Sequence, residues 1–353
     1  MNGPAILLTH ELLHTPFAKT AHGLVRGPSR WPISAVVDPR HAGRDAGEVL
    51  DGRVRGIPVF GAVSEALALD PRPTIAIVGV ATPGGVLPNG LRAALSDVLA
   101  GGLTLYNGLH ALLAGDPVLS RAAEAGSARI VDLRRPRQTS DLAFWSGAIK
   151  KVKPPRLALL GTDCAVGKRT TGLILREACR VVGLQCDMVY TGQSGWLQGL
   201  EHGFILDATP NDFVSGEMEA AILRCTSEST LDVVLIEGQS SLRNPSGPCG
   251  AELLLSADAK GAILQHVPGR KHFEDLENVP CPLPPVDEEV ALIRAYGTEV
   301  IAVTLNGRGL LPKDLQTRQG KLEDALGLPV ILPLEGGMER LVTCVRDWLE
   351  RVK

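Results

Sequence analysis

Residues 161–171, which read GTDCAVGKRTT, combine the residue types that hold phosphate groups. An apolar run precedes them and a helix-like run follows, so backbone N–H groups of a loop and a helix N-terminus can converge on an anion. Gly167 permits close backbone approach, and Lys168 adds a positive charge beside the phosphates. The pattern predicts a phosphate-binding loop with contacts from Thr162, Asp163, Cys164, Ala165, Val166, Gly167, Lys168, Arg169, Thr170 and Thr171.

This loop departs twice from the usual pattern G-x-x-x-x-G-K-[ST]. Gly161 lies one residue too early, and Arg169 stands where the pattern has a hydroxyl residue. Thr170 or Thr171 could replace that hydroxyl as a Mg²⁺ ligand. An extra cation beside the loop nevertheless suits a bound polyanion better than an ordered magnesium site.

A second set of polar residues follows the later apolar runs. Glu237 ends one of them, at a position where P-loop proteins hold magnesium or a water, so Thr170 and Glu237 are the expected metal ligands if ATP and Mg²⁺ are used. Glu237 and His266 are alternative general bases, and they join Lys168 as candidate catalytic residues. The candidate substrate-binding residues here are Gln193, Gln239 and Arg270, and Asn306 is a candidate for contacting an adenine edge.

The first half of the chain has a cationic cluster of its own. Lys19, His22 and Arg26 recur at helical spacing and would lie on one face, suited to a carboxylate or phosphate. The first apolar run is not followed by G-x-G-x-x-G, which argues against an ordinary nicotinamide site. Because of their clustered positive charge, we expect Lys19, His22 and Arg26 to bind substrate.

Composition excludes several classes of function. Hydrophobic residues make up 44% and charged residues 21%, as in a globular protein. Aromatic content is 4% and the formal net charge is -3, so we expect no nucleic-acid partner and no attraction to an anionic membrane. The seven cysteines form no C-x-x-C pair and the start of the chain has no secretory pattern, so we expect reduced thiols in a cytoplasmic protein.

Short apolar runs alternate with helix-like segments along the chain. The runs at 5–10, 33–38, 57–60 and 74–81 are predicted strands, and 88–102 has the apolar spacing of a helix. Buried strands joined by helices predict an α/β fold with parallel sheets covered on both faces. The charged, Pro-rich stretch at 149–156 predicts a linker, and the strand–helix pattern restarts after it. Two domains are therefore expected, residues 1–150 and residues 151–353.

The motifs also resemble those of known families. GTDCAVGK is similar to the loop of dethiobiotin synthetases, in which Thr likewise replaces the first formal Gly, and IPVFGAVSEA resembles the CoA-binding domain of succinyl-CoA ligases. AKTAHGLVR, GVATPGG, TGQSGW and EGQSSL, taken in order with these, resemble over nearly the whole chain a two-domain family long described as being of unknown function. The resemblance implies an N-terminal Rossmann-like domain and a C-terminal P-loop NTPase-like domain.

Some members of that family are assigned as D-glutamate N-acetyltransferases. The resemblance therefore implies transfer of an acetyl group from acetyl-CoA, as co-substrate, to the amine of a D-amino acid, with the loop binding the CoA phosphates. Members often have His where this chain has Asn244. The alternatives are an ATP- and Mg²⁺-dependent ligase or kinase acting on a carboxylate, and a non-catalytic nucleotide or CoA sensor. We expect a small amino-acid substrate as partner and a homo-oligomer.

Overall fold

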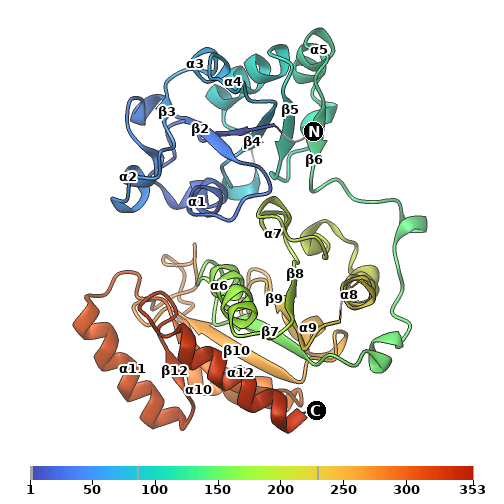
Figure 1. The fold of residues 1–353 in the computed structure, drawn as a ribbon, viewed down its shortest axis with the longest axis vertical. Helices are drawn as coiled ribbons and strands as arrows, with labels where there is room; N and C mark the ends of the chain where they lie inside the picture. Colours follow the sequence, from blue (N-terminus) through green and yellow to red (C-terminus); the bar gives the residue numbers. More distant parts are fainter. Residues whose placement is uncertain (1–2, 86, 229, 353) are drawn as a thin grey trace. The chain divides into compact units, whose positions relative to one another are not determined.

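Two parallel sheets organise the chain, each at the centre of one compact unit (Figure 1). The computed structural model describes residues 3–85, 87–228 and 230–352. Unit 1 comprises the described residues up to Pro136 together with Gln193–Leu200. Unit 2 comprises Arg137–Gly192 and the described residues from Glu201 onward. The predicted α/β class is confirmed in both units.

The sheet of unit 1 has the order β3-β2-β1-β4-β5-β6 within the described residues, and every pairing is parallel. The first strand is central, and the chain builds the sheet outward on each side of it, as in doubly wound nucleotide-binding folds. The strands are β1 (Ala5–Leu8), β2 (Ile33–Val37), β3 (Val59–Phe60), β4 (Ile75–Val78), β5 (Thr104–Asn107) and β6 (Ile130–Asp132).

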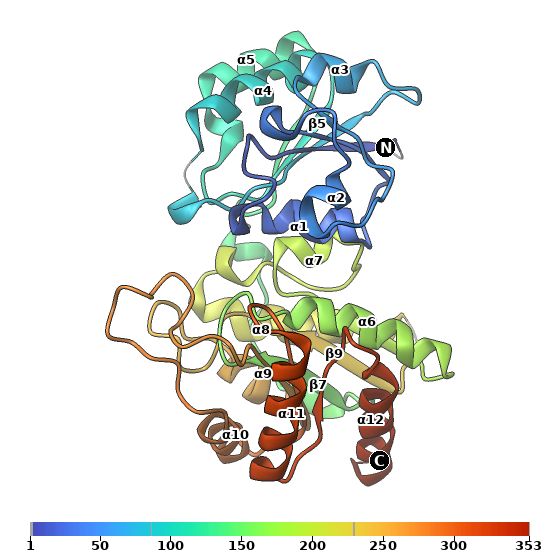
Figure 2. The same cartoon turned by 90° about the vertical axis from the view of Figure 1, so that its left-hand side faces the viewer.

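Helices cover both faces of this sheet (Figure 2). Alternating strand residues explain why, since Ile6 and Leu8 enter one apolar core while Ala5 and Leu7 enter the other. The first core packs against α3 (Val63–Leu67), α4 (Asn89–Ala100) and α5 (Pro117–Ala125). The second packs against α1 (Lys19–Arg26), α2 (Ala46–Asp51) and α7 (Gln193–Leu197).

The sheet of unit 2 is also parallel, with the order β12-β11-β10-β7-β9-β8 among the described residues. Its first strand in the sequence is again internal, between β10 and β9, so the segment that follows β7 lies above the middle of the sheet. The strands are β7 (Arg156–Gly161), β8 (Cys186–Val189), β9 (Val233–Glu237), β10 (Gly261–His266), β11 (Glu299–Leu305) and β12 (Val330–Ile331).

Helices also cover both faces of the second sheet. Ala158 and Leu160 of β7 enter a core shared with α8 (Asn211–Ser227), α9 (Ala251–Leu255), α10 (Val286–Ala295) and α11 (Pro312–Leu326). On the other face lie α6 (Lys168–Val181) and α12 (Met338–Val352). Gly172 of α6 lies against Leu159, so the missing side chain allows helix and strand to approach closely. The short 3₁₀ turns are η1 (Pro16–Ala18), η2 (Pro39–His41), η3 (Pro83–Gly85), η4 (Leu113–Gly115), η5 (Thr139–Asp141), η6 (Ala148–Lys151) and η7 (Leu206–Ala208).

The segment before β7 is bound to α8, which explains where unit 2 begins. Glu217 accepts hydrogen bonds from Arg137 and from the backbone N–H of Ala143. Glu219 accepts from the backbone N–H groups of Ser146 and of Ile149, which is fully buried. Packing therefore divides the chain after Pro136, whereas the Pro-rich stretch that suggested a division at residue 150 follows residues already held by unit 2.

Residues Gln193–Leu200 lie between two segments of unit 2 in the sequence but pack with unit 1. The ring of Trp196 lies 5.7 Å from that of Trp31 and 5.5 Å from that of Tyr106, centroid to centroid. The Arg30 guanidinium stacks 4.5 Å from the Trp196 ring centre and donates to the carbonyl oxygens of Trp196 and Leu200. This aromatic cluster fixes α7 to unit 1.

Candidate functional site

The phosphate-loop geometry predicted from the sequence is present in unit 2. β7 ends at Gly161, the loop follows, and α6 begins at Lys168. Gly167 precedes the helix with a φ of 111°, and Ala165 has a φ of 51°. The left-handed backbone at Gly167 turns the chain into the helix, so the first N–H groups of α6 face the loop.

Asp163 holds the loop in shape from within. Its carboxylate is completely buried and accepts four hydrogen bonds. Oδ1 accepts from the backbone N–H of Cys164 at 2.6 Å and from the Asn244 side chain at 2.9 Å. Oδ2 accepts from Arg270 at 2.7 Å and from the backbone N–H of Glu274 at 2.6 Å. Because three of these donors come from distant segments, Asp163 ties the loop to the strand ends around it.

Lys168 lies across the loop and is nearly buried. Its ammonium donates to the carbonyl oxygens of Asp163, at 2.7 Å, and Ser240, at 2.6 Å. Burial lowers the pKa of Lys168 to about 8, although the charges of Cys164 and Asp163 partly oppose that shift. An ammonium has three donors, and these contacts use two. A nearby phosphate would therefore favour the charged form.

Arg169 pairs with the acid at the end of the neighbouring strand. Its Nη1 lies 3.4 Å from Oε1 of Glu237, while Oε2 of Glu237 accepts from the backbone N–H of Thr191 at 3.1 Å. Burial raises the pKa of Glu237, and the Arg169 charge and the Thr191 N–H oppose that shift. A protein cation thus contacts the carboxylate that would hold a metal in a magnesium-dependent P-loop enzyme.

The two threonines expected to supply the magnesium hydroxyl do not fit that role as they lie here. Thr171 is buried and donates to Gln265 Oε1 at 2.6 Å, an oxygen that also accepts from Thr304. Thr170 is exposed on α6. With Arg169 on Glu237, the donor set does not match the oxygen-rich octahedron that Mg²⁺ requires.

His266, the alternative base, ends β10 beside the loop. Its Nδ1 lies 3.0 Å from the hydroxyl of Thr162. Burial, with the nearby charges of Arg270 and Arg318, lowers the pKa of His266 to about 4. The ring is therefore neutral near pH 7 and is a weaker base than an ordinary histidine.

Three further candidates contact the loop or its flanks. Arg270 donates to Asp163 and to the Cys164 carbonyl and also pairs with Glu274, so it supports the loop. Asn306 donates to the Val166 carbonyl at 3.0 Å, which puts its amide on the loop backbone. Gln239 donates to the Thr191 hydroxyl at 3.0 Å. The cysteine of the loop, Cys164, donates to the Ser240 hydroxyl at 3.4 Å.

The other substrate-binding candidates belong to unit 1. Lys19, His22 and Arg26 do lie on one helix, α1, at the predicted spacing. Lys19 is exposed, His22 Nε2 lies 2.7 Å from the Leu13 carbonyl oxygen, and Arg26 pairs with Asp51 at 2.9 Å. Gln193 is buried in α7, against Gly108. The structure therefore assigns these four side chains to a unit other than that of the phosphate loop.

Sequence reasoning missed the residues that hold the loop from other strands. Ser240 has a φ of 38° and offers its carbonyl to Lys168. Gln265 accepts hydrogen bonds from the hydroxyls of Thr171 and Thr304. Thr191 donates from its backbone N–H to the carboxylate of Glu237 and from its hydroxyl to the backbone carbonyl oxygen of Glu237. Each stands at or just beyond the carboxyl end of a strand, and that position is the signal that would have found them.

Asn244, noted in the sequence only as a departure from relatives, is part of this network. It is buried, donates to Asp163, and accepts from the backbone N–H and the hydroxyl of Ser246 at 2.9 and 2.7 Å. Histidine and asparagine can both donate to a carboxylate. Asn244 therefore donates a hydrogen bond to Asp163, and a histidine at this position could donate an equivalent one.

Comparison with protein families identifies both units. Residues 143–342 match the family described as "Domain of unknown function (DUF1611_C) P-loop domain", and residues 39–136 match "Domain of unknown function (DUF1611_N) Rossmann-like domain". The chain belongs to the DUF1611 family. The predicted order, a Rossmann-like domain followed by a P-loop domain, is thereby confirmed.

Several known proteins are similar over most of the chain. A crystal structure of a DUF1611 protein from Anabaena variabilis is 30% identical, with a TM-score of 0.88 over 98% of this chain and 100% of that one. Two curated proteins named D-glutamate N-acetyltransferase, from a Pseudoalteromonas species and Tritonibacter scottomollicae, are 28% and 30% identical. Each alignment covers 75% of this chain and 79% of the relative. No helix among the described residues is long and apolar enough to cross a membrane.

Proposed function

We propose that this protein transfers an acetyl group from acetyl-CoA to the amine of a D-amino acid such as D-glutamate. The names of the two curated relatives support this reaction. The observation that carries the proposal is the ion pair between Arg169 and Glu237, at 3.4 Å. It puts a cation where an ATP-hydrolysing loop needs a metal, so the loop suits the binding of a phosphorylated co-substrate that is not hydrolysed.

The phosphates of CoA would bind at the start of α6. CoA carries a pyrophosphate and a 3′-phosphate, and the loop offers backbone N–H groups together with Lys168 and Arg169. Asp163 and the side chains that bind it keep this loop in one conformation. A loop held in its binding shape loses little conformational entropy when the ligand arrives.

Glu237 is the proposed general base. The amine of an amino acid is protonated near pH 7, and a carboxylate with a raised pKa accepts a proton more readily than an ordinary one. The amine nitrogen then attacks the thioester carbon, a tetrahedral oxyanion forms, and the carbon–sulfur bond breaks. The proton that the nitrogen loses after the attack passes to the leaving sulfur, so CoA leaves as the thiol. The product is the N-acetyl amino acid, and Glu237 releases to solvent the proton it took from the ammonium. His266, with a pKa of about 4, is the weaker candidate.

The acceptor's carboxylates need positive partners. Lys19 is the proposed contact on α1, and Arg26 can serve with it once the substrate replaces Asp51. Both are long cationic side chains, suited to the two carboxylates of an acidic amino acid.

The test is an assay of the purified protein with acetyl-CoA and single D- or L-amino acids, without ATP and with EDTA present. We expect thiol release that depends on the acceptor, and an N-acetylated product by mass spectrometry. Acceptor-dependent phosphate release from ATP and Mg²⁺, without thiol release, would replace the proposal with the ligase or kinase. Saturable CoA binding without either product would replace it with the sensor.

A further inference from the structure

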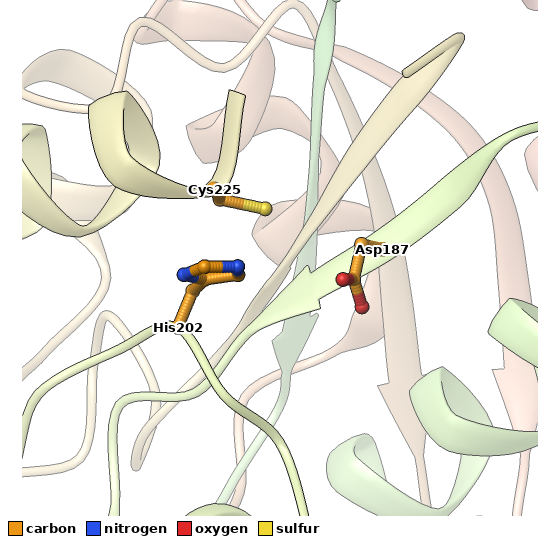
Figure 3. A group of neighbouring side chains, drawn as sticks. All are labelled: Asp187, His202 and Cys225. Atoms are coloured by element: carbon orange, nitrogen blue, oxygen red, sulfur yellow. The ribbon is translucent and has the colours of Figure 1, made fainter. Parts of the chain in front are cut away.

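Three side chains with different metal-binding atoms converge at one edge of the second sheet (Figure 3). Asp187 comes from β8, His202 from the segment that returns from α7, and Cys225 from α8. One ligand atom from each lies within 4.8 Å of the corresponding atoms of the other two. β8 is the edge strand, and β9 separates it from β7, which leads into the phosphate loop. The cluster is thus distinct from the candidate site for acyl transfer.

Backbone contacts position each of the three residues. Asp187 lies opposite Val234 in the pairing of β8 with β9. The backbone of His202 accepts a hydrogen bond from the N–H of Tyr190 at 3.0 Å, which holds the returning segment beside the end of β8. Cys225 is 1% exposed on the last turns of α8, which packs on β8. The three ligand atoms therefore meet through backbone contacts that do not depend on a metal.

One oxygen of Asp187 remains available to an ion. The hydrogen bond from the Met188 N–H and the ion pairs of Asp187 with Arg176 and Arg180, at 3.4 and 3.3 Å, all engage Oδ1. Oδ2 is thus the oxygen oriented for another partner. The Asp187 side chain is 23% exposed, so an ion has a path from solvent. In Figure 3 the sulfur of Cys225 points into the space between the other two side chains.

A further carboxylate lies beside the histidine. Oε2 of Glu228 is 3.5 Å from Nε2 of His202, and its side chain is largely exposed. With Nδ1 of His202 as the metal ligand, Glu228 would hold the second nitrogen and fix the orientation of the ring, as carboxylates commonly do for metal-bound histidines. Glu228 follows Cys225 by three residues, so the C-terminal end of α8 supplies both a thiol donor and this supporting acid.

We propose that Asp187, His202 and Cys225 bind one Zn²⁺ ion. Sulfur, imidazole and carboxylate donors together are typical of zinc, whereas Mg²⁺ and Ca²⁺ take oxygen ligands. Zinc bonds of about 2.0 to 2.3 Å put neighbouring ligand atoms roughly 3.5 Å apart, so small side-chain movements close the site. Three protein ligands leave a fourth position for water. The ion would join the returning segment, the edge strand and α8.

The test is a zinc titration of the full chain after treatment with a chelator, against a chromophoric competitor. We expect one tight equivalent per chain and a higher melting temperature with zinc. Co²⁺ should give a thiolate-to-metal charge-transfer band that Cys225→Ser abolishes. His202→Asn should lose more affinity than the roughly 10- to 100-fold expected for Glu228→Gln, which removes only the supporting charge. Cys344→Ser, in α12, is the matched control and should bind zinc like the unaltered chain.

Two results would overturn the site. One is zinc binding that Cys225→Ser and His202→Asn leave unchanged, and the other is no tight equivalent in the unaltered chain. If Cys225→Ser fails to fold, His202→Asn and the cobalt spectrum of the unaltered chain decide the question.

Discussion

An aspartate in each unit binds an arginine side chain, and the two lie in very different surroundings. Asp163 in the phosphate loop is fully buried and binds Arg270, whose side chain is 11% exposed. Asp51, at the end of α2, binds Arg26 and Arg55 at the surface, where the Arg26 side chain is 45% exposed. Buried charges that lose a partner are costly, whereas surface pairs are screened by water and salt. Loss of the partner should therefore cost more in the loop of unit 2 than on the surface of α1.

A perturbed pKa does not by itself distinguish these two cases. The hydrogen bond from Arg55 is the main cause that lowers the pKa of Asp51 to about 2, yet water surrounds much of this group. Such a pair contributes little to folding. Lys168 also has a shifted pKa, but burial is its cause, and burial makes a charge depend on its partners. The burial of a charged group, more than the presence of a partner, decides how strongly a substitution there destabilises the protein.

The largest expected effect is the loss of the buried aspartate. Asp163→Asn leaves Arg270 with a weakened partner and removes charge from two backbone contacts, so we expect unfolding free energy to fall by about 4 kcal/mol. The matched surface variant, Asp51→Asn, should change it by less than about 1 kcal/mol. Urea denaturation followed by circular dichroism measures both. Equal losses of unfolding free energy in the two variants would contradict the expected difference between the buried and the exposed aspartate.

The next effect concerns the two lysines and the binding of CoA. Lys168→Met should weaken CoA binding roughly 60-fold, or about 2.5 kcal/mol, because a charge-assisted hydrogen bond to phosphate is lost. Lys19→Met removes an exposed charge proposed to bind the acceptor, and should leave CoA affinity within about twofold. Isothermal titration calorimetry measures both constants. If Lys19→Met weakened CoA binding more than Lys168→Met, the proposal that Lys168 binds CoA and Lys19 binds the acceptor would be wrong.

A smaller effect concerns the pH dependence of the base. Glu237 must be deprotonated to accept a proton, and its pKa is raised, so kcat/KM should fall as pH decreases through a value above that of an ordinary glutamate. Arg169 lowers that pKa, so Arg169→Met should move the acid limb to higher pH. An acid limb near pH 4, the pKa of His266, would instead assign the base to His266.

The smallest effect tests the position at which this chain differs from relatives. Asn244→His should retain a donor to Asp163 and change unfolding free energy by less than about 1 kcal/mol. Asn244→Ala should cost about 2 kcal/mol because a buried hydrogen bond is lost. Thermal and urea denaturation compare the variants. A gain in turnover of tenfold or more in Asn244→His, with stability unchanged, would show that the histidine has a catalytic role that this chain lacks.

The fold and the loop were predictable because both depend on local pattern. Apolar runs of strand length and the position of Gly167 and Lys168 indicate a strand, a loop and a helix without knowledge of the rest of the chain. Arg169 was likewise recognised as a departure from the magnesium-dependent pattern. Its partner Glu237 was a separate candidate, but their pairing depends on β7 and β9 being neighbours.

What the sequence did not predict depends on contacts between distant segments. Asn244, Gln265 and Ser240 hold the loop from three other places in the chain, and no spacing rule relates them to it. The assignment of α7 to unit 1 has the same cause, because it requires Trp196 to meet Trp31 and Tyr106. Aromatic packing of this kind leaves no periodic signal in the sequence.

The excursion of Gln193–Leu200 also affects how such a protein can evolve. Because this segment interrupts unit 2 and packs with unit 1, neither unit is a continuous piece of sequence. A gene fragment ending near Pro136 would encode a unit 1 without Trp196, and Trp31 and Tyr106 would lose an aromatic neighbour. Simple recombination at one boundary could not exchange either half intact. We therefore expect the two units to be inherited together and to occur in one chain.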